Sequence, residues 1–514
     1  MYKKIYSLLI LFVLIGFAAF TLQPEPAQAE TPVKGGVLKV QREYFPQQIG
    51  YLPEWKPAEW IAALPWAERL VQWSAEGGYV PNLAESWDLD VDKKTLVFKL
   101  VKGVKFTDGT PFNAERLKAN FEYNLKAKRI KDGNYIESMD ILDEYALRLN
   151  LSHLTSAAML NYAFNMQIVS VEAIEKNGAD WARKNGIGTG PFIVTDFKHD
   201  TYIKYERNPN YWRPGMPYLD GMFIELSTDP LTTRMKLEAG DVDVWMDGSD
   251  VKMALELEKK GFKIVWGRGM MYTLIPNSGK PEDPNSPLTK KKVREAIEYA
   301  INRPVLANVL GFGKFEPLTQ IVPSFSPAYN RNFDLRPYNP EKARQLLAEA
   351  GYPKGFATTI MTTSPNRDAA TSVQNFLADV GIQVDIDIAD FGRYAASMFG
   401  GKGWDGLALC ISGIHPPGTD LYQHWGPRPN TFKGPFIKKS PEYIEACEIA
   451  LQTYEEGAMY AAMQKAVRIA SEDAMIVPLF RSALPHVMQP YVHTEYPMIH
   501  GIQWNSWEDW MEKH

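Results

Sequence analysis

The chain has 514 residues, of which 45% are hydrophobic and 23% are charged, and its formal net charge is −5 at pH 7. These values are ordinary for a soluble globular protein, and the length allows several domains. The negative charge argues against nucleic acid as a partner. Beyond the first 29 residues, no stretch reaches the roughly 18 apolar residues of a membrane span.

The first 29 residues have the pattern of a secretory signal. Lys3 and Lys4 precede an apolar run over residues 8–22, and Ala27-Gln-Ala29 is typical of a cleavage site. No cysteine follows the apolar run, so lipid attachment is not expected. The sequence therefore predicts a mature protein that is free in the periplasm.

A first strand is predicted at residues 36–40, and the segment that follows it, 44–73, is dense in aromatic side chains. Its four tryptophans are spaced by five to seven residues, which favours one face of a helix from Trp60 onward. They are Trp55, Trp60, Trp66 and Trp73. Most of these rings are expected in the core, because large apolar side chains are usually buried.

The next block, up to residue 188, is predicted to contain several strands and one helix. Leu96, Phe98 and Leu100 alternate with polar residues as in a strand, and residues 145–151 do the same. Asn113 is a suitable N-cap for the helix. We expect this block to have a structural role.

The stretch at residues 187–244 carries the densest set of local signals. At 187–192 the sequence Ile-Gly-Thr-Gly-Pro-Phe predicts a tight turn before a strand, because glycine permits unusual backbone angles and proline fixes φ. A second alternating strand at 202–206 completes a hairpin, and a helix follows that ends at Gly240. A phosphate-binding loop is disfavoured, because such a loop opens a helix whereas Pro191 and a strand follow these glycines.

The second half of the chain alternates between helices and strands. Prolines at 281–287 predict a stiff connection into it. One helix is capped by Asn339 and terminated by Gly351, strands and helices then alternate over residues 356–410, and an apolar strand is predicted at 474–480. This order predicts a mixed α/β half.

Four motifs, in the order and spacing of one family, carry a resemblance over residues 33–485. They are the stretches at 81–112, 187–244, 288–302 and 338–351. The chain resembles the large periplasmic solute-binding proteins of the peptide and nickel class, family 5, which deliver ligands to ABC importers. The resemblance implies an α/β, two-lobed periplasmic binding protein fold, type II-like and of the large three-domain class, with two interlobe crossovers.

The same resemblance divides the chain into a leader and two lobes. The signal peptide is 1–29, lobe I is 30–75 with 189–279 and 479–514, an extra subdomain of lobe I is 76–188, and lobe II is 280–478. The two crossings between the lobes are expected near Asn277 and Pro478.

The sequence shows no constellation of residues for catalysis or for a metal site. It has no Gly-x-Ser-x-Gly elbow, no His-Glu-x-x-His pair and no Walker lysine. Its eight histidines are scattered, and none pairs at i, i+4 on a clear helix. We therefore predict a monomeric binding protein that is no enzyme and has no cofactor. The resemblance implies that its partners are a small-molecule or peptide ligand and the permease subunits of an ABC transporter in the inner membrane.

A protein of this kind needs stacking surfaces and hydrogen-bonding groups at strand ends, where two lobes close on a ligand. The position of the cleft in the family implies nine candidate residues. They are Tyr44, Trp60, Trp245, Asp247, Tyr272, Ser412, His415, Asp420 and Trp425. For each aromatic residue, packing in the core is the alternative interpretation.

The family implies a peptide or peptide-like ligand. Its dipeptide binders carry an aspartate that pairs with the peptide amino terminus, and here Ile414 occupies that place. The arginine expected for the peptide carboxylate has no obvious match at 360–363. Because a buried unpaired charge is costly, a short dipeptide is disfavoured unless Asp420 substitutes. The alternatives are a neutral oligosaccharide, for which 14 tryptophans and 25 tyrosines offer stacking faces, and a ligand-presenting periplasmic sensor.

The chain has two cysteines, Cys410 and Cys447. Both are predicted to be buried thiols, one in an apolar strand and one on a helix. Export would permit a disulfide between them, but its geometry does not follow from the sequence.

Overall fold

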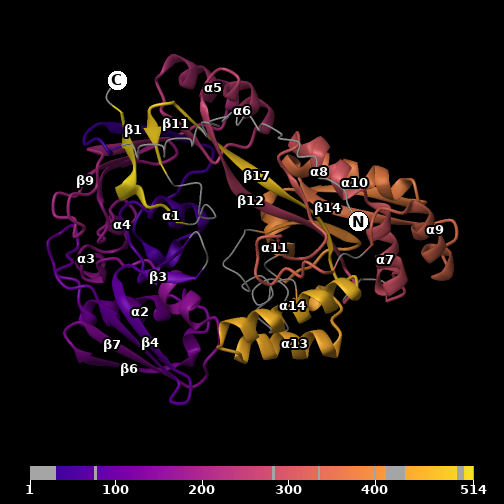
Figure 1. The fold of residues 1–514 in the computed structure, drawn as a ribbon, viewed down its shortest axis with the longest axis horizontal. Coiled ribbons are helices and arrows are strands. Elements are labelled where there is room, and N and C mark those ends of the chain that lie inside the picture. Colours follow the sequence, from indigo (N-terminus) through magenta and orange to yellow (C-terminus); the bar gives the residue numbers. More distant parts are fainter. Residues whose placement is uncertain are drawn as a thin grey trace, which may run out of the picture.

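The computed structural model describes residues 31–74, 78–279, 284–333, 336–398, 401–412, 426, 434–494 and 503–512. The predicted signal peptide therefore lies outside the described residues. Figure 1 shows two lobes side by side, linked by two long strands. Among the described residues, no helix combines the length and the apolar character that a membrane span requires.

Eleven of the described strands form one sheet that runs through both lobes. Its order is β15-β14-β16-β12-β17-β11-β1-β10-β9-β8, with β13 paired to β17 beside this path. The strands of lobe I are β1 (Val37–Arg42), β8 (Phe192–Lys198), β9 (Tyr202–Arg207), β10 (Gly221–Leu226) and β11 (Val244–Met246). Those of lobe II are β13 (Glu316–Pro317), β14 (Phe356–Thr363), β15 (Ile382–Ala389) and β16 (Leu407–Ser412).

The antiparallel strands β12 (Lys263–Pro276) and β17 (Val477–Met488) connect the two halves of this sheet. At one end β17 pairs with β11 of lobe I, and at the other β12 pairs with β16 of lobe II. The prediction of two adjacent crossovers is confirmed. They are long paired strands rather than short connections, and Asn277 and Pro478 mark only their lobe II ends.

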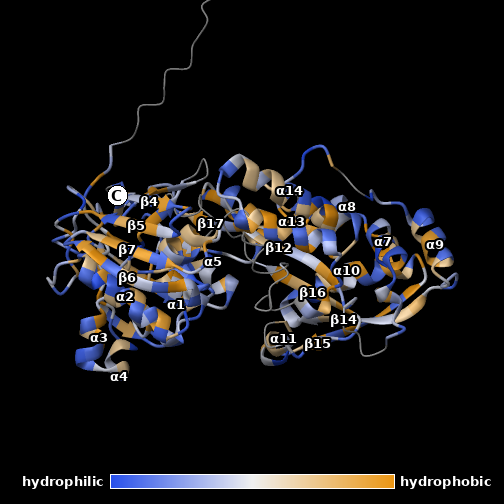
Figure 2. Ribbon diagram, turned by 90° about the horizontal axis from the view of Figure 1, so that it is seen from below, coloured by the Kyte–Doolittle hydropathy of each residue, from blue (hydrophilic) through white to orange (hydrophobic). Residues whose placement is uncertain are grey.

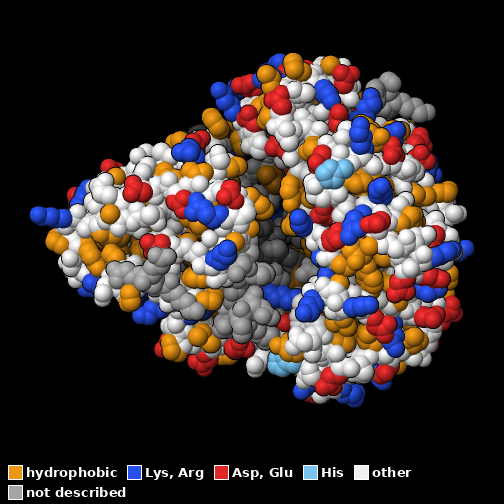
Figure 3. Space-filling view, turned by 180° about the vertical axis from the view of Figure 1, so that it is seen from behind, with side chains coloured by type: hydrophobic (Ala, Val, Ile, Leu, Met, Phe, Trp, Pro, Cys, Tyr) orange, Lys and Arg blue, Asp and Glu red, His pale blue; other side chains and the backbone are white. Residues whose placement is uncertain are grey.

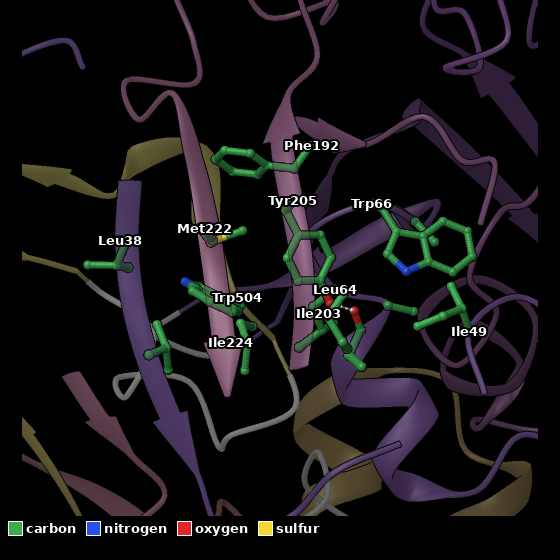
Figure 4. Close-up of a cluster of buried hydrophobic side chains, with 14 of the residues drawn as sticks. Leu38, Ile49, Leu64, Trp66, Phe192, Ile203, Tyr205, Met222, Ile224 and Trp504 are labelled. Carbon is green, nitrogen blue, oxygen red and sulfur yellow. Dashed lines mark hydrogen bonds between the residues drawn. The ribbon is translucent and has the colours of Figure 1, made fainter. Parts of the chain in front are cut away.

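The core of lobe I lies between the sheet and the aromatic segment that follows β1 (Figure 4). Ile203, Tyr205, Met222 and Ile224 of β9 and β10 point into this core, because alternate side chains of a strand share one face. The Tyr205 hydroxyl also donates to the backbone carbonyl of Ala62 at 2.9 Å, which ties the sheet to that segment.

The aromatic segment forms only a short helix, α1 (Pro57–Ala62), and the longer helix expected from Trp60 onward is wrong. Pro65 follows α1, and a proline has no N–H for a helical hydrogen bond. Trp73 lies instead in strand β2 (Val71–Trp73). The rings of Trp66 and Trp73 are nevertheless buried, as predicted.

Gly188 and Gly190 lie directly against the backbone of Trp66. A Cβ at Gly188 would lie 2.1 Å from the Trp66 carbonyl oxygen, and one at Gly190 would lie 2.6 Å from the Trp66 carbonyl carbon. The N–H of Gly190 donates to that carbonyl oxygen at 3.0 Å. The turn at 187–192 therefore needs glycine because two chain segments touch there, and any side chain would separate them.

The buried carboxylate of Glu68 holds a later part of the same stretch. It accepts hydrogen bonds from the Tyr211 hydroxyl and from the Trp212 indole N–H, both at 2.9 Å. Burial raises the pKa of Glu68. The stretch at 187–244 is thus anchored to the aromatic segment at two places, once by close backbone packing and once by a buried acid.

The subdomain of lobe I is a four-stranded sheet that shares a hydrophobic cluster with one helix. Its elements are β4 (Ala84–Asp90), β5 (Thr95–Leu100), β6 (Ile136–Asp143), β7 (Ala146–Leu151) and α2 (Ala114–Lys126), while β3 (Tyr79–Pro81) pairs with β2 in a separate two-stranded sheet. Asn113 caps α2 as predicted, because its side chain accepts from the N–H of Arg116 at 3.1 Å.

Lobe I also contains α3 (Val171–Asn177), α4 (Ala179–Ala182), α5 (Pro230–Ala239), α6 (Val251–Glu258), and the small pair β18 (Val492–His493) and β19 (Trp510–Met511). Gly240 closes α5 with a φ of 76°, which confirms its predicted role as a helix terminator.

Lobe II has helices on both faces of its strands. One hydrophobic cluster joins the sheet to α7 (Lys291–Ala300), α8 (Arg303–Gly311), α9 (Pro340–Glu349) and α10 (Arg367–Ala378). Another joins it to α11 (Phe391–Met398), α13 (Pro441–Gln452) and α14 (Glu456–Glu472). Apolar residues gather where these helices meet the strands (Figure 2). Asn339 caps α9, and Gly351 follows it with a φ of 95°, as predicted.

Cys410 on β16 and Cys447 on α13 are both buried thiols in the second of these clusters, and no disulfide joins them. Burial raises the pKa of the Cys447 thiol to about 12, so this group is unreactive at neutral pH.

Candidate ligand site between the lobes

The surface is hollowed between the two lobes, and Lys or Arg side chains lie along the edge of the hollow (Figure 3). In open α/β sheets, ligands bind outside the carboxyl ends of the strands. The carboxyl ends of β1 and β11 lie side by side in lobe I, with Arg42 opposite Met246. The residues at these strand ends are therefore candidates for a ligand site.

Arg42, Asp247 and His486 form what we call the strand-end cluster. Arg42 and Asp247 make an ion pair, in which the Arg42 side chain is 5% exposed and the Asp247 side chain 18%. Asp247 has a φ of 56°, an angle that few residues other than glycine adopt. The sharp turn of the backbone after β11 thus returns the predicted site residue Asp247 toward β1.

His486 reaches this cluster from the crossing strand β17. The backbone N–H of Asp247 donates to its Nδ1 at 3.2 Å, and its Nε2 lies 3.8 Å from an Asp247 carboxylate oxygen. Burial lowers the pKa of His486 to about 4, the negative charge of Asp247 opposes this shift, and the positive charge of Arg42 adds to it. The imidazole is therefore neutral near pH 7, with Nδ1 as an acceptor.

A second group lies around Arg69, beside the predicted residue Trp60. The Arg69 guanidinium lies 4.7 Å from the centre of the Trp60 ring and 4.5 Å from that of Phe164. Gln167 donates to the backbone carbonyl of Trp60 at 3.0 Å. Burial lowers the pKa of Arg69 to about 9, a value at which the guanidinium still carries its charge at neutral pH. Trp60 itself is half-buried against the core of lobe I.

Tyr272 lies on the lobe II side of the crossing strand β12. Its ring stacks on Phe480 of β17 with centroids 4.5 Å apart, and its hydroxyl donates to the side chain of Asn366 at 3.3 Å. Burial raises the pKa of Tyr272. The ring is thus partly packed in lobe II, and its role in ligand binding stays a prediction.

The other predicted residues are placed unequally. Tyr44 is 51% exposed just beyond the end of β1. Ser412 is buried at the end of β16, and its hydroxyl has no hydrogen-bond partner among the described residues. His415, Asp420 and Trp425 lie outside the described residues, so they stay predictions.

The structure corrects the stacking role expected for Trp245. Its side chain is completely buried in a cluster with Leu237 of α5, Leu257 of α6 and Val487 of β17. Helices α5 and α6 cover the face of β11 from which the Trp245 side chain projects. The ring therefore points into the core rather than into the cleft. Trp245 therefore offers no face to a ligand in this structure.

A further pair of arginines lies on the crossing strands, beside β13 of lobe II. Arg268 of β12 and Arg481 of β17 lie over the ring of Phe325, at 3.9 and 5.5 Å from its centre. Arg481 donates to Glu316 at 2.8 Å. Burial and the neighbouring Arg481 lower the pKa of Arg268. This part of the hinge is thus positively charged.

Arg42, Arg69 and His486 were missed from the sequence. A signal was present for Arg42, which lies between the strand predicted at 36–40 and the candidate residue Tyr44. For His486 no local signal exists, because its partner Asp247 lies 239 residues away in the sequence. Within the described part of the chain, no group of three or more His, Cys, Asp or Glu side chains is arranged to hold a metal ion.

Comparison with known proteins places the chain in a family. Residues 78–427 match the model of the bacterial extracellular solute-binding proteins, family 5, middle region. The chain belongs to this family. The resemblance seen in the sequence is therefore confirmed, and members of the family are binding proteins.

Individual relatives agree with this placement. The glutathione-binding proteins GsiB of Escherichia coli and of Shigella boydii are 33% and 32% identical, and the match covers 64% of this chain and 65% of each relative. The matched part thus spans slightly less than two thirds of these relatives. The periplasmic binding protein DppA of Helicobacter pylori, solved with the peptide STSA, is 26% identical with a TM-score of 0.78, covering 94% of this chain and 99% of its own. NikA of Brucella suis, solved with Fe(III)-EDTA, is 20% identical with a TM-score of 0.80, covering 92% of this chain and 100% of its own, and it supports the fold alone.

Proposed function

We propose that this protein is the periplasmic substrate-binding component of an ABC importer, which captures a peptide or peptide-like solute and delivers it to a membrane permease. The observation that carries the proposal is a family 5 chain whose two lobes are linked by the adjacent strands β12 and β17. Two neighbouring strands can bend together, so they are suited to act as a hinge between lobes that close on a ligand.

The charges of the candidate site favour a ligand with charged ends. Arg42 and Asp247 place one charge of each sign at the strand ends, paired with each other, and Arg69 is a buried cation against the Trp60 and Phe164 rings. A peptide carries a carboxylate and an ammonium group, which such charges can pair with, whereas a neutral oligosaccharide carries neither. The peptide bound by the Helicobacter pylori relative and the glutathione named for GsiB belong to this chemical class.

The proposal also includes the boundaries of the two lobes, the removal of the signal peptide and the monomeric state. Lobe I consists of the segments given above with its subdomain, lobe II is the segment between the two crossings, and the signal peptide is removed on export. The protein acts as a monomer in the periplasm, with the permease as its partner.

Native mass spectrometry of the purified protein tests the ligand class directly. We expect a co-purified molecule whose mass is that of a short peptide or a peptide-like compound. Small-angle scattering of the protein with and without that molecule should show a smaller radius of gyration in its presence, because the lobes close. A bound sugar, or binding with no change in the radius, would contradict the proposal.

Dipeptides are expected to bind weakly, because Ile414 replaces the carboxylate that would pair with their amino terminus. Calorimetry with a dipeptide panel, glutathione and a neutral oligosaccharide panel compares wild type with Asp420→Asn. We expect the dipeptides to bind no more tightly than about 1 mM, because burying an ammonium without a counter-charge costs several kcal/mol. Micromolar dipeptide binding that Asp420→Asn abolishes would show that Asp420 supplies the missing carboxylate, and the expectation of weak dipeptide binding would then be wrong.

A further inference from the structure

The two lobes meet a second time, at a place remote from the crossing strands. The loop after β7 in the subdomain contacts the carboxyl end of α13 in lobe II. The N–H of Ser156 donates to the carbonyl of Leu451 at 2.8 Å, and its hydroxyl donates to the carbonyl of Ala450 at 3.0 Å. In return, the Tyr454 hydroxyl donates to the carbonyl of Leu154 at 2.7 Å. In Figure 1 the end of α13 reaches the subdomain across the lower part of the molecule.

These contacts satisfy groups that a helix end leaves open. The last four carbonyls of a helix have no N–H partner within it. In α13, which ends at Gln452, the carbonyl of Ile449 accepts from the nearby Thr453 hydroxyl at 2.7 Å. The next two carbonyls accept from Ser156 of the other lobe. Lobe I thus supplies a cap for a helix of lobe II, and separating the lobes returns these carbonyls to water.

Apolar packing accompanies the hydrogen bonds. Leu154 is 4% exposed, and the ring of Tyr454 packs against the hydrophobic cluster of the subdomain. The same cluster contains Phe164, the ring that lies against Arg69 in the candidate site. The contact and the candidate ligand site therefore share one packed unit.

We propose that residues 154–156 and 450–454 form a latch, a pair of segments that stabilises the closed arrangement of the lobes by a shared helix cap. The latch rests on the hinge closure of the proposed function, and it adds an element that acts on the side of the cleft away from the hinge. Opening the cleft breaks three hydrogen bonds, so the latch sets part of the balance between closed and open molecules and slows ligand release.

Tyr454→Phe and Ser156→Ala test the latch, separately and together, because each removes one hydroxyl donor and leaves the backbone intact. Each substitution is expected to lower the ratio of closed to open molecules by roughly fivefold, the effect of losing one ordinary hydrogen bond. Tyr205→Phe is the matched control, since its hydroxyl also donates to a backbone carbonyl but within lobe I. All variants are compared by thermal unfolding to confirm that they fold.

Double electron–electron resonance measures the distance across the latch between two spin labels. One label is attached at Asp92→Cys in the subdomain and the other at Lys465→Cys on α14. Both positions are exposed, and the two native thiols are buried, so labelling is selective. We expect longer and broader distances in the latch variants and an unchanged distribution in Tyr205→Phe. Distances that stay at the wild-type values in the double variant would overturn the latch. So would rapid hydrogen exchange at the Ser156 amide of the wild type. None of these measurements needs a ligand. If the latch variants open while native mass spectrometry finds a bound sugar, the latch stands and the proposed function alone is refuted.

Discussion

Gly188→Ala is expected to lower the free energy of unfolding by about 3 kcal/mol or more, the range for a side chain forced into a packed interior. The added Cβ would lie 2.1 Å from the Trp66 carbonyl oxygen and 3.0 Å from the Cα of Ala67. Both are backbone atoms, so neither can rotate away as a side chain would. The two chain segments must separate, which also strains the hydrogen bond from Gly190 to the same carbonyl. Urea unfolding followed by tryptophan fluorescence measures the loss as a lower midpoint.

Gly457→Ala is the matched control for this substitution. Gly457 lies at the start of α14, and the atom nearest to its added Cβ is a carboxylate oxygen of Glu455 at 3.2 Å, which belongs to a flexible side chain. Alanine is a better helix former than glycine, so we expect a change within about 1 kcal/mol, of either sign. Similar losses in the two variants would contradict the close backbone contact at Trp66.

The stability of the wild type is expected to fall by about 3 kcal/mol between pH 6.5 and pH 4 through His486 alone. The folded protein holds the pKa of this histidine at about 4, below its ordinary value of 6.5. Between these values the unfolded chain binds a proton that the folded protein does not, so acid favours unfolding. The contribution of His486 is complete above pH 6.5 and is lost as the pH falls to 4.

His486→Gln isolates this effect from the other titrating groups. The glutamine carbonyl can accept the hydrogen bond from the Asp247 N–H, and the side chain does not titrate. Chemical unfolding at several pH values should show that the free energy of unfolding of the variant falls less than that of the wild type as the pH is lowered. A constant difference between the two proteins over this range would mean that the imidazole is not held neutral by burial.

Much of the fold was predictable because its signals are local. Asn113, Gly240, Asn339 and Gly351 each act within one turn of a helix, and their roles follow from backbone chemistry that a short stretch of sequence displays. The family match had the same basis, since motifs of a few residues in a fixed order suffice to recognise it. The helix that does not continue beyond Ala62 has a local cause as well, because Pro65 lacks the N–H that a helical hydrogen bond needs.

The candidate site was predicted less well, because burial is decided by elements far apart in the sequence. Trp245 follows a strand as a cleft residue would, yet its burial depends on α5, α6 and β17. Arg42, Asp247 and His486 come from three separate regions and meet only when the sheet is assembled. Tyr44 lies exposed just beyond the first strand, and its role in ligand binding stays a prediction.

The strand order of the large sheet has a consequence for the order in which parts of the chain fold. In lobe I, β11 lies between β1 and β17, so neighbouring strands come from the first, the middle and the last parts of the chain. Most of lobe II comes from the single continuous stretch between β12 and β17. Contacts between distant segments form slowly, and an N-terminal part emerges first. Lobe II can therefore become compact while β11 still lacks its outer neighbour, and the pairing of β17 with β11 and β12 then joins the two lobes through the hinge.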